Sequence, residues 1–87
     1  MKVSNLISKS GNNVANQFEI LTDNARFFQS YNSIIAKIDY DNNITLDSTY
    51  WNYSRTTSKY RNMFLNMSTD DIQKGIKSGN IKLDNLN

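Results

Sequence analysis

Apolar and polar residues alternate along residues 34–47, and this pattern limits the possible folds more than any other feature of the chain. Successive residues of a strand point to opposite faces of a sheet, so such alternation is typical of strands with one buried face. Asp41-Asn42-Asn43 interrupts the alternation with residues that tolerate the left-handed backbone of a tight turn. The segment therefore predicts a β-hairpin, with apolar positions at Ile34, Ala36, Ile38, Tyr40, Ile44 and Leu46.

Two further strands are predicted upstream of this hairpin. Residues 14–21 place Val14, Phe18 and Ile20 on one face, and the aromatic-rich residues 25–31 follow a turn at 22–24. The preceding segment, residues 3–9, has the spacing of a short helix that begins at Ser4 and ends at Gly11. An extended arm fits the same residues.

After Asp47 the apolar spacing becomes helical. Tyr60, Met63, Phe64 and Met67 lie on one face of a helix that begins near residues 54–57. A second helix begins at residues 68–71, where Ser and Thr are good caps and acids suit the first turn, and it ends at residues 78–80. Its apolar stripe is Ile72 and Ile76, and an extended tail that docks on the body carries Ile81, Leu83 and Leu86.

This order of elements predicts the α+β class. We expect a single domain over residues 1–87, because a chain of this length supports only one core. Its architecture would be an antiparallel β-meander of three to four strands over residues 14–47. Two short C-terminal helices would follow and pack on one face of the sheet.

The composition argues against catalysis. The chain has no cysteine and no histidine, so thiolate chemistry and the commonest general base are both missing. A serine paired with Lys59, either Ser54 or Ser58, is the remaining nucleophile, and no spacing singles it out. The three glycines are scattered, so no glycine-rich phosphate-binding loop is present. Asp41-Asn42-Asn43 lacks the glycine and the final glutamate of a calcium-binding loop. We therefore expect no enzyme, no cofactor and no metal.

The charges divide unevenly along the chain. Net charge is +2, with residues 1–47 at −1 and residues 48–87 at +3. Lys74, Lys77 and Lys82 could extend a basic surface in the second half. No apolar run is long enough for a membrane span or a signal peptide, so we expect a cytoplasmic protein with no membrane contact.

Residues 50–61 combine aromatic and basic side chains, and no acidic residue lies between Asp47 and Asp70. This mixture suits a protein interface, whose energetic hot spots are rich in Trp, Tyr and Arg. It also suits single-stranded nucleic acid, because bases stack on rings while phosphates contact cations. A third interpretation places the rings in the core and leaves the cations solvated. The candidate partner-binding residues are Tyr50, Trp51, Tyr53, Arg55, Lys59 and Arg61.

Two stretches, Phe28–Ala36 (FQSYNSIIA) and Trp51–Arg61 (WNYSRTTSKYR), followed by Phe64-Leu65, resemble a family of small bacteriophage proteins. These proteins are a domain of unknown function from phages of AT-rich Gram-positive bacteria. The similarity runs from Val3 to Leu86 and transfers no catalytic residue. The resemblance implies a phage setting, in which small proteins of this kind inhibit or redirect host machinery.

We therefore expect a non-enzymatic phage accessory protein that binds and modulates a host protein in the host cytoplasm. Expected targets are a defence nuclease of the CRISPR–Cas type or a replication or transcription factor. The alternative is a protein that binds single-stranded nucleic acid through residues 50–61. Both functions are compatible with a homodimer.

Overall fold

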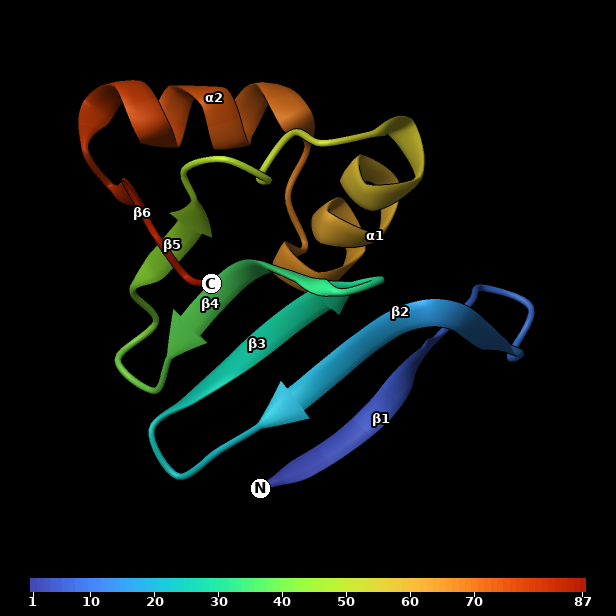
Figure 1. Ribbon diagram of the computed structural model, residues 1–87. Coiled ribbons are helices and arrows are strands. Elements are labelled where there is room, and N and C mark those ends of the chain that lie inside the picture. Colours follow the sequence, from blue (N-terminus) through green and yellow to red (C-terminus); the bar gives the residue numbers. More distant parts are fainter.

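The computed structural model describes all 87 residues and contains one six-stranded sheet whose spatial order, β1 to β6, follows the chain (Figure 1). Neighbouring strands from β1 to β5 pair antiparallel, and β6 pairs parallel to β5. A parallel pair needs a long crossover, which here contains both helices. The strands are β1 (Lys2–Ile7), β2 (Asn13–Leu21), β3 (Ala25–Ser30), β4 (Ser33–Asp39), β5 (Ile44–Asp47) and β6 (Ile81–Asp84), and the helices are α1 (Arg55–Leu65) and α2 (Thr69–Ser78).

The hairpin predicted over residues 34–47 is confirmed as β4 and β5. Asn42 supplies the left-handed residue of the turn, with φ of 66°. Asp39 holds the turn, because its Oδ1 accepts hydrogen bonds from the Asp41 and Asn43 backbone amides, both at 2.9 Å. These bonds, with the Asn43 contact largest, lower the pKa of the Asp39 carboxyl.

One detail of the predicted alternation is wrong. The β3–β4 register shifts after Phe28, which pairs with Ala36, whereas Gln29 pairs with Ile34. Ile35 is therefore the extra residue of a β-bulge. It is fully buried next to Ala36 instead of alternating away from it, and Ile34 lies on the opposite face.

Both helices begin close to the predicted positions and α2 ends at the predicted one, whereas α1 ends before Met67, which was expected on its apolar face. The Ser54 hydroxyl accepts a hydrogen bond from the Thr57 amide at the start of α1, and Ser68 does the same for Asp71 at the start of α2. Asn66 and Gly79 end the two helices in left-handed conformations. Local capping chemistry therefore sets the helix boundaries.

The N-terminal segment and the sheet size depart from expectation. The short helix expected at residues 3–9 is wrong: Lys2–Ile7 form β1, so the extended alternative is correct. The C-terminal tail also joins the sheet as β6. The sheet therefore has more strands than the three to four predicted, because β1 and β6 are added at its two edges.

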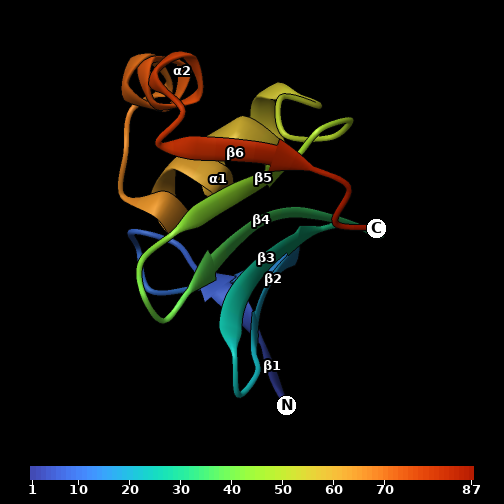
Figure 2. The same ribbon diagram turned by 90° about the vertical axis from the view of Figure 1, so that its left-hand side faces the viewer.

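The main core lies between the helices and one face of the sheet (Figure 2). In both views the helices lie together near β4 to β6, whereas β1 and the N-terminus lie farthest from α2 (Figures 1 and 2). No helix has the length and apolar character required to cross a membrane. The core residues are Phe28, Ile35, Ala36, Leu46, Phe64, Leu65, Ile72 and Ile81.

Candidate functional site

The aromatic–basic segment begins in the loop between β5 and α1, which one buried carboxylate holds in place. Asp47 is 1% exposed, and its Oδ2 accepts hydrogen bonds from the Thr49 and Tyr50 amides at 3.0 and 2.8 Å. Its Oδ1 accepts from the Leu86 amide and the Asn87 side chain. Burial alone would raise the pKa of Asp47, but these four donors outweigh it, so the pKa lies below its usual value.

The three aromatic residues of this loop differ in exposure. Tyr50 and Trp51 are half-buried and pack against the core, as the third interpretation of this segment expected. Tyr53 is 63% exposed and meets Tyr50 edge to face, with ring centroids 5.8 Å apart. Of the predicted aromatic contacts, Tyr53 therefore offers the most surface to a partner.

Arg61 has an internal role. It is 0% exposed, and its NH1 donates to the Trp51 carbonyl oxygen at 2.7 Å. Its NH2 donates to Asn62 Oδ1 at 2.9 Å, and its guanidinium lies 5.4 Å from the centroid of the Trp51 ring. Burial lowers the pKa of Arg61. The side chain ties the loop to α1 and has no surface to offer a partner.

No carboxylate neutralises this buried cation. All its hydrogen-bond acceptors are neutral oxygens: the Trp51 carbonyl, the Asn52 and Asn62 amides, and the Thr69 hydroxyl. Arginine stays protonated in proteins, so the positive charge persists. An uncompensated charge of this kind adds to the positive potential of the nearby surface.

The other two predicted cations lie on the exposed side of α1. Arg55 and Lys59 are one helical turn apart and both exposed. Arg55 occupies the first residue of α1, where the helix dipole is positive and a cation is unfavourable. Lys59 Nζ lies 5.2 Å from the centroid of the Tyr60 ring. This helix face is therefore electropositive.

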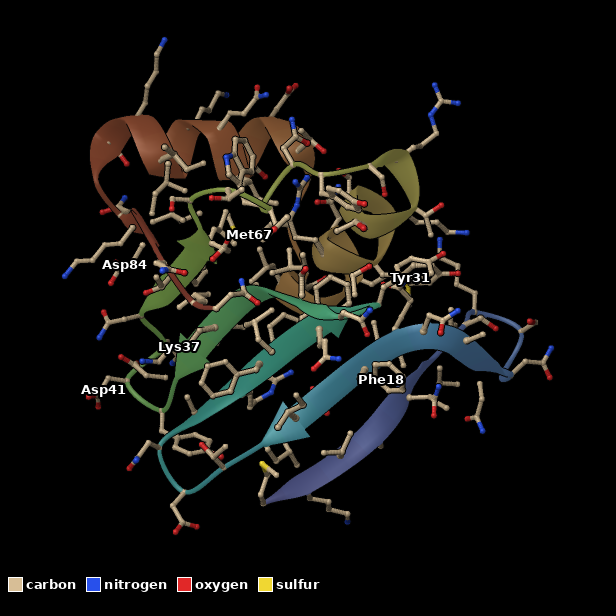
Figure 3. The ribbon with its side chains drawn as sticks, viewed as in Figure 1. Phe18, Tyr31, Lys37, Asp41, Met67 and Asp84 are labelled. Atoms are coloured by element: carbon tan, nitrogen blue, oxygen red, sulfur yellow. The ribbon has the colours of Figure 1, made fainter.

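A second exposed aromatic residue lies beside this face. Ser30 Oγ and Thr57 Oγ1 are hydrogen-bonded at 2.9 Å, which joins the end of β3 to α1. Tyr31 follows directly, is 49% exposed, and lies next to α1 (Figure 3). From the sequence Tyr31 was predicted only as part of a strand, because a strand pattern carries no information about which helix will pack beside it.

A groove of about 840 Å³ lies between α1 and the β1–β2 loop. Ser8, Lys9 and Ser10 of the loop line the groove together with residues from Lys59 to Ser68, and Figure 2 shows the loop near the C-terminal end of α1. Lys9 lies on the loop wall and Lys59 on the helix wall, and no acidic residue lines the groove. The lining residues are Ser8, Lys9, Ser10, Lys59, Tyr60, Asn62, Met63, Asn66, Met67 and Ser68.

Only the α1 wall of this groove lies in a segment that the sequence singled out. Met63 was expected on the core face of α1 but is 37% exposed, because Thr57 and Arg61 take part in the buried face instead. The loop wall was missed because residues 3–9 were interpreted as a helix. The lack of acids between Asp47 and Asp70 was the sequence signal that pointed to this region.

The remaining candidates fall outside the groove. Lys74 and Lys77 line a shallow depression on α2 together with Asp70, and Lys82 is exposed on β6. The Ser54 hydroxyl donates to Thr57 Oγ1 and the Ser58 hydroxyl to Asn52 Oδ1, so neither serine is hydrogen-bonded to Lys59. No group of three or more His, Cys, Asp or Glu residues is arranged to hold a metal ion.

Comparison with known proteins assigns the chain to a family. A model described as "Family of unknown function (DUF8033)" matches residues 1–80, and the chain belongs to this family. No curated protein and no solved structure shows significant similarity to the chain.

Proposed function

We propose that this member of DUF8033 is a non-catalytic binding protein whose groove and exposed α1 face contact an acidic surface of another protein. The observation that carries the proposal is the groove itself, which has a lysine on each wall and no acidic lining residue. A surface of one charge sign selects partners of the opposite sign and speeds their encounter. The bound surface would therefore be rich in Asp and Glu.

The apolar part of the groove supports a protein partner. Met63 and Met67 are flexible side chains that adapt to irregular surfaces, and Tyr60 adds an aromatic contact. Tyr53 and Arg55 extend the contact beyond the groove, where both are exposed. Tyr50, Trp51 and Arg61 support this surface from beneath.

We place this activity in a phage setting, on the strength of the resemblance of Phe28–Ala36 and Trp51–Arg61 to small phage proteins. The partner would be a host protein, such as a defence nuclease or a replication or transcription factor. A protein of this size and charge would act by covering a surface, since its net charge of +2 does not mimic nucleic acid.

Single-stranded nucleic acid is the second candidate partner. The exposed Tyr53 ring lies two residues from the exposed Arg55, an arrangement that allows a base to stack while a phosphate contacts the cation. Affinity for an oligonucleotide would then fall steeply as salt concentration rises. Salt-independent or undetectable binding of an oligothymidine probe would eliminate this candidate.

The proposal is tested by affinity purification from nuclease-treated host lysate with three forms of the protein. The wild-type chain and the Lys77→Glu control are expected to retain one stoichiometric host protein. Lys59→Glu is expected to lose it, because the same charge reversal then lies inside the groove. Equal recovery by all three forms, or recovery of no protein by the wild type, would refute the proposal.

A further inference from the structure

The β1–β2 hairpin turns its more apolar side away from the helices. Residues directly opposite each other on neighbouring strands share a face of the sheet. Val3 pairs with Ile20, Ile20 with Phe27, and Phe27 with Lys37. This row lies on the face opposite the one that carries the buried Phe28.

The side of the hairpin that faces the helices is more polar. Gln17, Glu19 and Ser4 lie on this side, in the rows that include Ser30 and Phe28. Gln17 is 1% exposed, yet neither its Oε1 nor its Nε2 has a hydrogen-bond partner. A buried amide without partners is unfavourable, and pairing register normally places the apolar side inward. The chain thus buries Gln17 of β2 and leaves Phe18 and Ile20 on the side that no helix covers.

The uncovered face is mainly apolar over β1 to β3, and Ile34 extends the apolar part onto β4. Phe18 pairs with Gln29, and Gln29 with Ile34, so these residues form a second row beside the first. Figure 3 shows Phe18 on β2 and Lys37 two strands away on β4. An antiparallel sheet with one solvated face normally carries polar residues there. The apolar residues of this face, most of them half-buried and Val3 exposed, are Val3, Phe18, Ile20, Phe27 and Ile34.

The charges of this face fit a second copy of the same chain. Its β4–β6 end carries Lys37 and Lys82 with Asp39 and Asp84, so the signs balance and two copies can pair opposite charges. The β1–β3 part presents no charge, and homodimer interfaces are more apolar than transient ones. A partner with strong charge of either sign would find no complement on this face.

The size of the face is also close to that of a standard interface. Six strands about 4.8 Å apart, each rising about 3.3 Å per residue, give a projected area of roughly 550 Å². Accessible area exceeds projected area on a surface of protruding side chains. The face therefore approaches the roughly 800 Å² per partner of a standard interface.

We infer that two copies of this chain associate through the uncovered sheet face, with Phe18, Ile20 and Phe27 at the centre of the contact. The dimer has four layers, with the two sheets inside and the helices outside. Both grooves between α1 and the β1–β2 loop stay open, so the dimer holds two partner sites. Two linked sites bind a multivalent target more tightly than one.

Sedimentation equilibrium tests the association. The wild-type chain is expected at twice its 10.0 kDa mass, and Ile20→Lys at 10.0 kDa. The variant should self-associate at least about tenfold more weakly, since it places a charge in the apolar contact.

Lys59→Glu, outside this face, should remain dimeric. Circular dichroism shows whether each variant keeps its fold. A wild-type chain that stays monomeric at high micromolar concentration overturns the inference.

Thiol protection tests which surface is used, even if Ile20→Lys fails to fold. The chain has no cysteine, so Gln29→Cys and Asn66→Cys each carry a single thiol. Labelling of Gln29→Cys should slow as protein concentration rises, because the second copy covers this face. Labelling of Asn66→Cys, in the groove, should not change. If the chain is dimeric and the labelling rates of both thiols are independent of concentration, the assignment to this face is overturned. Association through the exposed edge of β1 would give that result.

Discussion

The two helices begin and end alike, but their charges are arranged in opposite ways. α2 has Asp70 and Asp71 in its first turn and Lys77 in its last, as the helix dipole favours. α1 has Arg55 at its first residue, no acid in its first turn and no base in its last. α2 therefore follows the rules for a stable helix, and α1 breaks them.

Their buried faces differ in the same sense. α2 buries Ile72 against the core, whereas α1 buries Thr57 and Arg61 together with Phe64 and Leu65. Natural sequences depart from local stability rules mainly where function requires it. α2 therefore meets the needs of the fold, whereas α1 keeps a cation at its first residue and buries Thr57 and Arg61 at some cost to stability, as the proposed contact surface would require.

The largest expected effect comes from removing the buried cation of α1. Arg61→Ala should lower the free energy of unfolding by about 3–5 kcal/mol, since it leaves a cavity and unpaired groups where the guanidinium was. Urea unfolding followed by Trp51 fluorescence measures this. Arg55→Ala is the control and should change stability by less than about 0.5 kcal/mol. Equal effects of the two variants would contradict the buried role of Arg61.

The next effect concerns the close approach of α2 to β6. A Cβ at Gly75 would lie 2.6 Å from Ile81 Cδ1 and 2.8 Å from its Cγ1, and Ile81 is 3% exposed. Gly75→Ala should therefore destabilise by about 1–3 kcal/mol, despite the better helix propensity of alanine. In an Ile81→Ala background the same substitution should become neutral or stabilising. A double-mutant cycle by urea unfolding checks this, and an additive result would rule out the clash.

A smaller, pH-dependent effect belongs to the loop that supports α1. The pKa of Asp47 is lower in the folded chain, so its contribution is present above the unfolded pKa of about 4 and is lost as pH falls through the folded pKa. Asp47→Asn should destabilise by about 1–2 kcal/mol near neutral pH. The difference from the wild type should shrink as pH falls below about 4. Urea unfolding over a series of pH values measures it, and a pH-independent difference would contradict the role of the ionised carboxylate.

The smallest effect has the opposite sign and tests the comparison most directly. Arg55→Glu should stabilise the chain by about 0.3–1 kcal/mol, because an acid at the start of α1 suits the helix dipole. The same substitution should weaken recovery of the partner protein. The matched change on α2, Asp70→Lys, should lower stability and leave recovery intact. If Arg55→Glu lowers the stability of the chain or leaves recovery of the partner protein unchanged, Arg55 does not trade helix stability for partner binding.

Much of the local structure followed from the sequence. Strands β2 to β5 were predicted because alternation and turn residues act over a few neighbours, and Ser54 and Ser68 marked the helix starts for the same reason. The candidate site was predicted only in part. Tyr53, Arg55 and Lys59 are exposed as a contact surface requires, whereas Arg61 is buried.

The missing half of the site depended on contacts between distant residues. The loop wall at Ser8–Ser10 meets α1 only after β1 has paired with β2. The spacing of Val3, Leu6 and Ile7 fits a helix or a strand, and that pairing decided between them. Local spacing could not reveal Tyr31 beside α1 or the uncovered face with Phe18, since both depend on which side of the sheet the helices occupy.

The sequence by itself determined where strands, turns and helices form and which chemical groups the protein lacks. These properties depend on backbone preferences, capping and composition, which act within a few residues. Only the tertiary structure decided which faces are covered, that Arg61 is internal, and that an acid-free groove opens beside α1. Burial and surface potential depend on residues that are far apart in the chain, so they are defined only once the chain has folded.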